Sequence, residues 1–163
     1  MITVDENSID IEKLGYRQGA VGVVVDKDNN FLIVQNLDYK EGEWRFPGGG
    51  VEEGEGPQGA ILRELAEELG TNKFEIVSTS QYRNQYDWPR EVILRRLREE
   101  GKTWKGQQQT HFLVKFTGSR EEIKFKKGEI RQVKWVKREE LRSHLVLPGQ
   151  WEFINQVLQE LLP

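Results

Sequence analysis

The sequence contains no cysteine in its 163 residues. This absence excludes a disulfide framework, a thiolate metal site and a cysteine nucleophile. Long apolar runs are also missing, since the longest spans seven residues, 19–25, against the roughly 20 that a membrane helix needs. A hydrophobic fraction of 36% and an aromatic fraction of 10% are too high for a disordered chain. Length and composition therefore predict one globular domain over residues 1–163, with no membrane association.

The N-terminal region lacks the pattern of a secretory signal peptide. Such a peptide begins with positive charge and continues with an apolar run. This region instead carries acidic side chains at Asp5, Glu6, Asp10 and Glu12. We therefore expect a cytoplasmic protein.

An excess of charge of one sign is also absent, because the formal net charge is only -3. The charges are nevertheless segregated along the chain. Residues 37–70 hold nine acidic and three basic side chains, a net of -6, whereas 81–105 and 120–138 have nets of +3 and +5. The sequence therefore contains one acidic segment and two basic segments.

Hydrophobic periodicity predicts a mixed α/β fold. Two β-branched runs, 21–25 and 31–35, are separated by a polar turn and indicate a β-hairpin. Residues 57–69 have helical spacing, with proline at the first position and Gly70 as a stop. Other expected elements are a short strand at 44–46, strands at 74–79, 81–86, 110–116 and 130–136, a helix of about two turns from Arg138, and a C-terminal amphipathic helix. We expect the glycines at 48–50 to interrupt regular structure.

Three carboxylates share one side of the predicted helix. Glu64, Glu67 and Glu68 fall within an arc of about 100°, beside the apolar stripe. Like charges at this spacing repel one another, so they need a compensating cation. Oxygen ligands favour a hard divalent ion, magnesium or manganese rather than zinc. Three glutamates alone would favour a solvated acidic face over a metal site, so the metal interpretation depends on their context.

The context is a glycine-rich turn placed between a strand and the helix. Glycines there allow backbone groups to approach a ligand closely. The full pattern is Gly49, five residues, Glu55, seven residues, Arg63-Glu64-Leu65, one residue, Glu67-Glu68, one residue and Gly70. This pattern resembles the Nudix box, the signature of the Nudix hydrolases. Thr71 stands where that box normally has a bulky aliphatic residue.

The resemblance implies an α/β/α sandwich around a central mixed sheet, and hydrolysis of a phosphoanhydride bond in a nucleotide substrate. It implies that Glu64, Glu67 and Glu68, with the Gly49 carbonyl, bind Mg²⁺ or Mn²⁺, and that Arg63 orients the glutamates. The i, i+4 spacing of Arg63 and Glu67 supports this orienting role independently. The base that accepts the proton of the attacking water is either Glu67 or a more distant glutamate.

Three stretches outside the box resemble the bacterial branch of RNA pyrophosphohydrolases and dinucleoside polyphosphate hydrolases. They are Gly15-Tyr16-Arg17, Trp44-Arg45-Phe46-Pro47, and Gly106-Gln107-Gln108-Gln109 before Phe112-Leu113. This likeness implies substrate-binding roles for Arg17, Gln107 and Gln109. It also makes Glu129 a further metal ligand or the alternative base.

The chain departs from that branch at three places that help to hold phosphate or base in relatives. It has Gln35 and Asn36 where basic residues are usual, residues 147–150 in place of an aromatic-lysine pair, and His111 in place of tryptophan. The substrate therefore remains open between RNA 5′-triphosphate ends and dinucleoside polyphosphates. A housecleaning nucleoside triphosphatase and a non-catalytic nucleotide- or RNA-binding module are the alternatives.

The basic segments allow two interpretations. They could follow an RNA backbone while Tyr82, Tyr86 or Trp88 stacks a base. Alternatively, residues 95–100 form a solvated charged loop or short helix, and these aromatics belong to the core. The second interpretation is preferred for any single residue. The oligomeric state and the identity of the released phosphate are not evident from the sequence.

Overall fold

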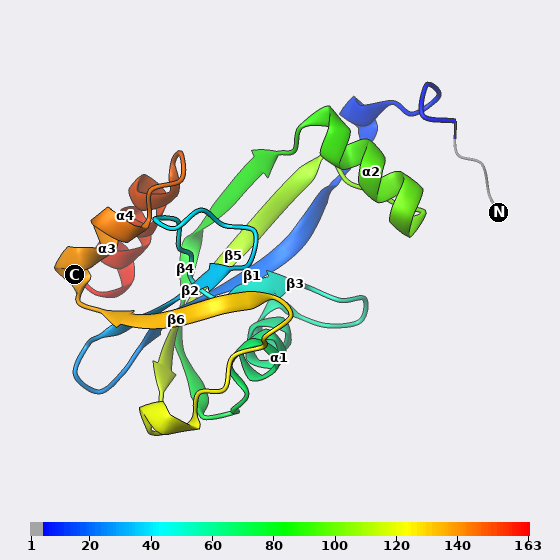
Figure 1. Cartoon of the computed structure of the whole chain (residues 1–163). Helices are drawn as coiled ribbons and strands as arrows, with labels where there is room; N and C mark the ends of the chain where they lie inside the picture. Colours follow the sequence, from blue (N-terminus) through cyan, green and yellow to red (C-terminus); the bar gives the residue numbers. More distant parts are fainter. Residues whose placement is uncertain (1–4) are drawn as a thin grey trace.

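The computed structural model describes residues 5–163, and its centre is a six-stranded mixed sheet (Figure 1). The strand order is β4-β5-β1-β2-β6, and the short strand β3 pairs with β1. β1 and β5 are parallel, whereas the other pairings are antiparallel. The strands are β1 (Tyr16–Val25), β2 (Phe31–Asn36), β3 (Gly48–Gly50), β4 (Phe74–Asp87), β5 (Gly106–Phe116) and β6 (Ile130–Val136).

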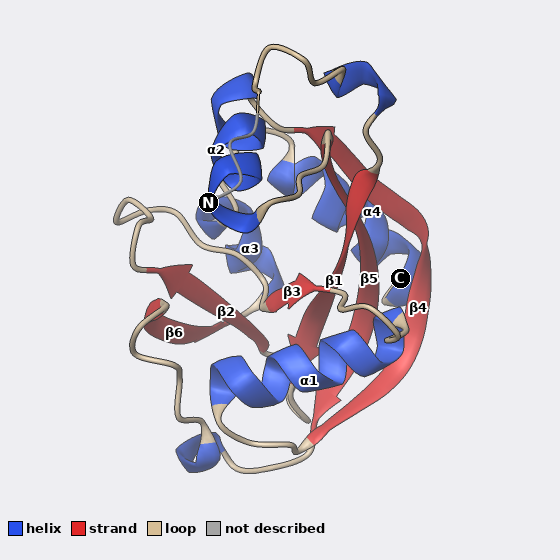
Figure 2. Cartoon of the chain, turned by 90° about the vertical axis from the view of Figure 1, so that its right-hand side faces the viewer, coloured by secondary structure: helices blue, strands red, loops and turns tan. Residues whose placement is uncertain are grey.

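Helices cover both faces of the sheet, which confirms the predicted α/β/α architecture. Figure 2 shows α1 in front of the sheet and α3 and α4 behind it. The α-helices are α1 (Pro57–Leu69), α2 (Arg90–Glu100), α3 (Leu141–His144) and α4 (Gln150–Leu161). Short 3-10 turns are η1 (Ile11–Lys13), η2 (Arg120–Glu122) and η3 (Arg138–Glu140). No helix in the part of the chain from residue 5 onward is both long and apolar enough to cross a membrane.

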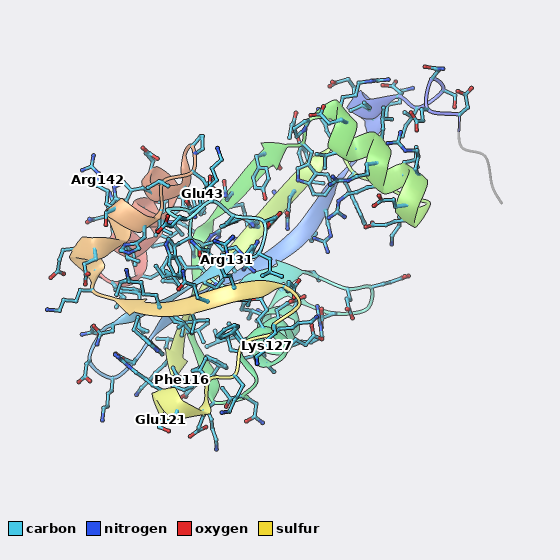
Figure 3. All side chains as sticks on the ribbon, viewed as in Figure 1. Glu43, Phe116, Glu121, Lys127, Arg131 and Arg142 are labelled. Carbon is cyan, nitrogen blue, oxygen red and sulfur yellow. The ribbon has the colours of Figure 1, made fainter. Side chains whose placement is uncertain are left out.

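Alternating side chains divide the interior into two cores. Leu32 and Phe112 pack with α1 on one face, whereas Ile33 and Leu113 pack with α4 on the other. Because successive strand residues point to opposite faces, the central strands must be apolar at nearly every position. Phe116, drawn in Figure 3, belongs to the α1 core, and Glu121, Lys127 and Arg142 in the same view are exposed. Both cores therefore depend on the same sheet.

The predicted boundaries of α1 are confirmed. Pro57 occupies the first turn, where its missing N–H leaves no helical bond unmade. Gly70 ends the helix in the left-handed region with φ of 71°, and a Cβ there would lie 2.5 Å from the Lys124 carbonyl oxygen. The helix therefore ends where glycine alone fits.

The prediction that residues 48–50 interrupt regular structure is wrong. They form β3 and pair with Gly19–Val21 of β1. A Cβ on Gly48 would lie 2.2 Å from the Ala20 carbonyl oxygen, so the absence of a side chain permits this close pairing. The expected strand at 44–46 is reduced to one isolated bridge between Arg45 and Val34.

The region from 74 to 105 also differs in part from its prediction. The two expected strands at 74–79 and 81–86 form the single strand β4, which has register shifts between Ile76 and Ser78 and between Thr79 and Arg83. The charged residues 95–100 belong to α2, which begins earlier, at Arg90. Tyr86 is 39% exposed, so it does not belong to the core.

Candidate active site

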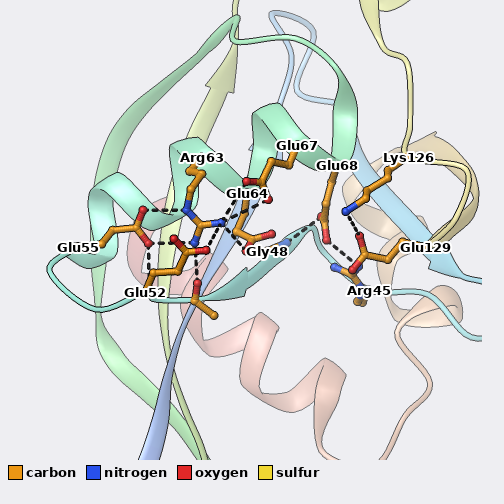
Figure 4. Close-up of polar contacts among 11 residues, drawn as sticks. Arg45, Gly48, Glu52, Glu55, Arg63, Glu64, Glu67, Glu68, Lys126 and Glu129 are labelled. Carbon is orange, nitrogen blue, oxygen red and sulfur yellow. Dashed lines mark hydrogen bonds and ion pairs between the residues drawn. The ribbon is translucent and has the colours of Figure 1, made fainter. Parts of the chain in front are cut away.

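Arg63 holds the loop before α1 against the helix and against β3. It donates to both carboxylate oxygens of Glu55, at 2.8 and 2.9 Å, and to the Gly50 carbonyl oxygen at 2.9 Å (Figure 4). It also donates to Glu64 at 3.0 Å and forms an ion pair with Glu67 at 3.3 Å. The guanidinium holds the pKa of Glu55 down to about 2. The geometry therefore suits the orienting role predicted for Arg63.

Glu64 lies directly against the glycine turn. A Cβ added to Gly49 would be 2.3 Å from the Glu64 carboxyl carbon, so this glycine leaves room for the carboxylate. Burial raises the pKa of Glu64, Arg63 opposes this effect, and the charges of Glu67 and Glu129 raise the pKa further. Glu129 is therefore near enough to act on a residue of α1, although it lies 65 positions away in the sequence.

Glu68 is buried, and both of its carboxylate oxygens have partners. One accepts from Arg45 at 3.0 Å and the other from the Gly48 N–H at 3.2 Å. Arg45 itself is held by Asn36 Oδ1 at 2.8 Å and by the Phe46 carbonyl oxygen at 3.1 Å. Burial raises the pKa of Glu68, and the charge of Arg45 opposes that effect. Glu68 thus anchors the turn between Arg45 and β3 as well as standing at a predicted metal-ligand position.

Glu67 and Glu129 are the exposed members of this group, with 51% and 53% of their side-chain surfaces accessible. Lys126 forms an ion pair with Glu129 at 3.5 Å. We call Glu64, Glu67, Glu68 and Glu129 the carboxylate cluster (Figure 4).

The carboxylate cluster fits a hard divalent cation by the chemistry of its donors. Its members offer only carboxylate oxygens, and the backbone of Gly49 lies against Glu64. Among residues 5–163, no group of three or more acidic or histidine side chains is already arranged around a metal position. Instead, Arg63, Arg45 and Lys126 pair with carboxylate oxygens of the cluster.

A cavity of about 560 Å³ opens beside the glycine turn and brings the three predicted substrate-binding residues together. Gly48 and Gly49 line it at the box, and Arg17, Gln107 and Gln109 line the adjoining wall. Arg17 and Gln107 are partners in the parallel β1–β5 register. Residues 90 positions apart in the sequence thus meet at one wall.

Arg17 presents a half-buried guanidinium next to the box. A Cβ on Gly50 would lie 2.1 Å from Arg17 Nη2, so the guanidinium lies against the glycine turn. The indole of Trp104 lies 6.0 Å from the guanidinium carbon. Burial lowers the pKa of Arg17, and the charge of Arg96 lowers it further. Within residues 5–163 Arg17 forms no ion pair, which suits the binding of an anion.

Two β4 side chains orient the glutamines: Asn84, which the sequence analysis did not name, and Tyr86, which it named only as a possible base-stacking residue. Tyr86 donates to Gln107 Oε1 at 3.1 Å, and Asn84 Nδ2 donates to Gln109 Oε1 at 3.1 Å. With the amide oxygens engaged, the amide N–H groups remain as donors for the cavity. Residues 84 and 86 alternate along β4, so the sequence indicates that they lie on the same face of the strand. Their partners, however, depend on the β4–β5 register.

Residues to which the sequence analysis gave no substrate-binding role also line the cavity. His111 of β5, Phe153 of α4 and the loop 147–150 line it. Burial lowers the pKa of His111 to about 3. The loop 147–150 lacks the expected aromatic-lysine pair, yet it still contributes to the wall.

The two basic segments have different surroundings. In 120–138, Arg120 pairs with Asp26 at 2.9 Å, and Arg131 donates to the carbonyl oxygens of Leu37 and Tyr39. These contacts attach the segment to other parts of the fold. In 81–105, Arg96 stacks over Trp88 at 4.5 Å, on the side of the molecule that carries Arg17.

Comparison with known proteins shows which family model and which relatives the chain matches. A model of the NUDIX domain matches residues 16–158. The chain is 33% identical over 153 residues to a protein named RNA pyrophosphohydrolase from Rickettsia africae, with 90% of each chain covered. A protein of the same name from Rickettsia prowazekii is 32% identical over the same length and coverage.

Solved structures share the fold at lower identity. The E. coli dihydroneopterin triphosphate pyrophosphohydrolase superposes with a TM-score of 0.67 and 21% identity, covering 89% of this chain and 99% of its own. The C. elegans Ap4A hydrolase superposes with a TM-score of 0.59 and 19% identity, covering 87% and 93%. These two similarities concern the fold.

Proposed function

We propose, from the premise that this chain belongs to the Nudix hydrolase family, that its carboxylate cluster and cavity hydrolyse phosphoanhydride bonds in nucleotides. The preferred substrates are RNA 5′-triphosphate ends or dinucleoside polyphosphates. Relatives named RNA pyrophosphohydrolase over 90% of the chain support the first substrate class. The observation that carries the proposal is the half-buried Arg17, placed against the glycine turn between the cavity and the carboxylate cluster.

Nudix hydrolases generally require divalent metal ions, and Mg²⁺ is the ion proposed here, with Mn²⁺ as its substitute. When bound, such an ion neutralises phosphate oxygens and lowers the pKa of a coordinated water. Glu64, Glu67, Glu68 and Glu129 would supply carboxylate ligands, and Gly49 would supply its carbonyl oxygen. A cytoplasmic location is part of the same proposal.

The proton of the attacking water needs a carboxylate that can reach solvent and substrate together. Glu67 and Glu129 meet this requirement, since each has about half of its side-chain surface accessible. Glu67 is proposed as the base, because Arg63 already holds its carboxylate at 3.3 Å. Glu129 is the alternative.

The remaining side chains hold the substrate. Arg17 would bind phosphate oxygens, with its guanidinium fixed against Gly50 and Trp104. The amides of Gln107 and Gln109 would donate to the substrate from the neighbouring strand. Their positions are set by Tyr86 and Asn84.

Substitution of Glu67 by glutamine tests this function. The variant and the wild type are incubated with Mg²⁺ and, separately, with 5′-triphosphorylated RNA, diadenosine tetraphosphate and free nucleoside triphosphates. Loss of the base should lower kcat by about 10²- to 10⁴-fold while the fold is retained, because the side chain is half exposed. Product identification shows which phosphate is released.

Glu75→Gln is the matched control, because it removes the same charge from an exposed position on β4. Equal activity of the Glu67 variant and the wild type would contradict the role of Glu67, and Glu129→Gln would then be examined. No cleavage of any anhydride by the wild type would contradict the enzymatic function and favour a binding module. Cleavage confined to free triphosphates would instead identify a housecleaning enzyme.

A further inference from the structure

Arg45 connects the carboxylate cluster with the cavity. Its Nη2 pairs with Glu68 Oε1 at 3.0 Å (Figure 4), and the same residue lines the cavity of about 560 Å³ beside Gly48. Arg63 and Lys126 also pair with members of the cluster, but neither is among the described residues that line the cavity. Arg45 is therefore the cation that joins a predicted metal ligand to the space proposed for the substrate.

The guanidinium of Arg45 is also fixed by two contacts that do not involve Glu68. Nε donates to Asn36 Oδ1 at 2.8 Å, and Nη1 donates to the Phe46 carbonyl oxygen at 3.1 Å. With the contact to Glu68, these bonds use three of the five N–H groups of an arginine. Within residues 5–163 the other two have no hydrogen-bond partner. The side chain can therefore release Glu68 without leaving the cavity, and it retains donors for a ligand there.

Glu68 is the buried carboxylate that Arg45 and a divalent ion would both neutralise. Only 3% of its side chain is exposed, so its negative charge requires a neighbouring cation. In the metal-free protein Arg45 supplies that cation. Once Glu68 binds a divalent ion, Arg45 loses its neutralising anion and faces a second positive charge. A guanidinium that is 20% exposed then favours another anion as its partner.

We propose that Arg45 is a phosphate ligand controlled by Glu68: it neutralises Glu68 in the metal-free protein, and it donates to a phosphate oxygen of the substrate once Glu68 binds a divalent ion. This inference rests on the proposed function, since it adds a substrate-binding residue to the same site. Arg45 and Arg17 both line the cavity, so the two guanidiniums would hold the polyphosphate together. The consequence is an order of binding, in which the protein binds phosphate weakly before it binds metal and strongly afterwards.

Arginine suits this change of partner better than lysine. Its planar fork keeps the contacts to Asn36 and Phe46 on some N–H groups while other N–H groups donate to a phosphate. The opposing interpretation is that Arg45 only anchors the turn before β3 to Glu68. An anchor would not bind phosphate more strongly after Glu68 has lost its charge. The two interpretations therefore differ even in the absence of metal, where no reaction takes place.

Glu68→Gln separates the two interpretations, because it removes the charge of Glu68 without a metal ion. The protein is freed of metal by dialysis against EDTA and then against buffer alone. Binding of adenosine 5′-(α,β-methylene)diphosphate, whose bridging carbon prevents hydrolysis, is measured by calorimetry. The variant should bind this analogue about five- to tenfold more tightly than the wild type, which is the gain expected from one charge-assisted hydrogen bond.

Glu67→Gln is the matched control. It removes the same charge from the neighbouring position of α1, but its partner Arg63 is not part of the cavity wall within residues 5–163. We expect its affinity for the analogue to stay within about twofold of the wild type, since an exposed charge contributes little. When Arg45→Gln is added to Glu68→Gln, the gain of Glu68→Gln should disappear, because no guanidinium is left to be released.

A second comparison keeps Glu68 intact. Mg²⁺ should raise the affinity of the wild type for the analogue, and Arg45→Gln should retain only part of that increase. Complexes between Mg²⁺ and the analogue affect both proteins equally, so they cancel in the comparison. Circular dichroism establishes that each variant is folded. If Glu68→Gln is not folded, the comparison of the wild type with Arg45→Gln decides alone.

Four results would overturn the inference: no gain in folded Glu68→Gln, an equal gain in Glu67→Gln, a gain that persists in the double variant, or an equal effect of Mg²⁺ on the wild type and Arg45→Gln. Binding of the analogue is independent of cleavage. A wild type that cleaves anhydrides without these gains contradicts only the role of Arg45. The expected gains in a protein that cleaves no anhydride contradict only the proposed function.

Discussion

Arg45 and Glu68 form a buried ion pair at the inner end of the carboxylate cluster, with 3.0 Å between Arg45 Nη2 and Glu68 Oε1. The Glu68 side chain is 3% exposed and the Arg45 side chain is 20% exposed. A buried carboxylate without a compensating cation is strongly destabilising. Arg45 therefore supplies, in the metal-free protein, the positive charge that a divalent ion would supply to Glu68.

The first prediction concerns the substitution of Arg45 by glutamine. In EDTA the variant should be less stable by about 2–3 kcal/mol, at or below the lower end of the range for broken buried pairs because Arg45 is partly exposed. Mg²⁺ should then raise the midpoint of thermal unfolding more in the variant than in the wild type, since Glu68 gains its missing cation.

Arg142→Gln is the control for that comparison, because it removes an arginine from an exposed position on α3. Its Mg²⁺-induced shift should equal that of the wild type. An equal shift in the Arg45 variant would show that Glu68 is not a metal ligand and serves only to anchor the turn.

A second prediction concerns the contact between Gly49 and Glu64. In Gly49→Ala the new Cβ would lie 2.3 Å from the Glu64 carboxyl carbon, so the carboxylate must move. We expect metal affinity, measured by calorimetry, to fall about 10- to 100-fold, as it does when the support of a ligand is removed.

Gly59→Ala is the matched control, on the helix that carries Glu64. A Cβ there meets only Glu55 Cγ at 3.6 Å, which is ordinary contact, and alanine has the higher helix propensity. This variant should bind metal normally and be more stable by about 0.5–1 kcal/mol. Normal metal affinity in Gly49→Ala would mean that Glu64 is not part of the metal site.

Gly49, Glu64 and Glu68 lie in the part of the site that the sequence predicts well. Helix α1 begins at Pro57, ends at Leu69 and carries its glutamates on one side because helical spacing and end signals are local. The structure places Gly49, the first residue of the box, against Glu64 of that helix, and Arg63 on the helix itself. Local patterns could not show that Arg45 pairs with Glu68, since this contact joins residues 23 positions apart.

The cavity wall could not be predicted because it depends on strand register. Tyr86 faces Gln107 and Asn84 faces Gln109 only after β4 has shifted register between Thr79 and Arg83. A shift of one residue would turn these side chains to the opposite face of the sheet. The prediction that residues 48–50 interrupt regular structure failed because glycine permits both a turn and a close strand pairing.

A third prediction follows from the low pKa of His111. The ordinary value is 6.5 and the folded value is about 3, so between these values the unfolded chain binds a proton that the folded chain does not. The stability associated with the neutral ring is complete above pH 6.5 and is lost progressively as the pH falls toward 3. The loss approaches about 1.4 kcal/mol per pH unit.

His111→Phe should remove this pH-dependent contribution to the free energy of unfolding. Urea unfolding at pH 7.5, 6.0 and 5.0 measures the free energy of unfolding for both proteins, and their difference isolates His111 from carboxylates that titrate in each. The variant should lose less stability than the wild type on acidification. Parallel curves would show that the imidazole can be protonated in the folded state.

The last prediction concerns Arg96, the α2 residue whose charge lowers the pKa of Arg17. Two guanidiniums near one another repel, and each lies near an indole, Arg96 over Trp88 at 4.5 Å and Arg17 over Trp104 at 6.0 Å. Glu100 pairs with Arg96 at 3.4 Å, and the charges of Glu100 and Glu64 offset part of the effect of Arg96 on Arg17. A polyanion lying between the two arginines would relieve this repulsion.

Arg96→Gln should therefore raise KM for 5′-triphosphorylated RNA about five- to tenfold with little change in kcat, because the residue would contact substrate away from the reacting phosphorus. The salt dependence of KM should also become shallower. Arg95→Gln is the matched control, since Arg95 is exposed on the same helix and is not among the groups that affect the pKa of Arg17 most. If both variants raise KM equally, α2 acts through its overall charge, and Arg96 has no specific place beside Arg17.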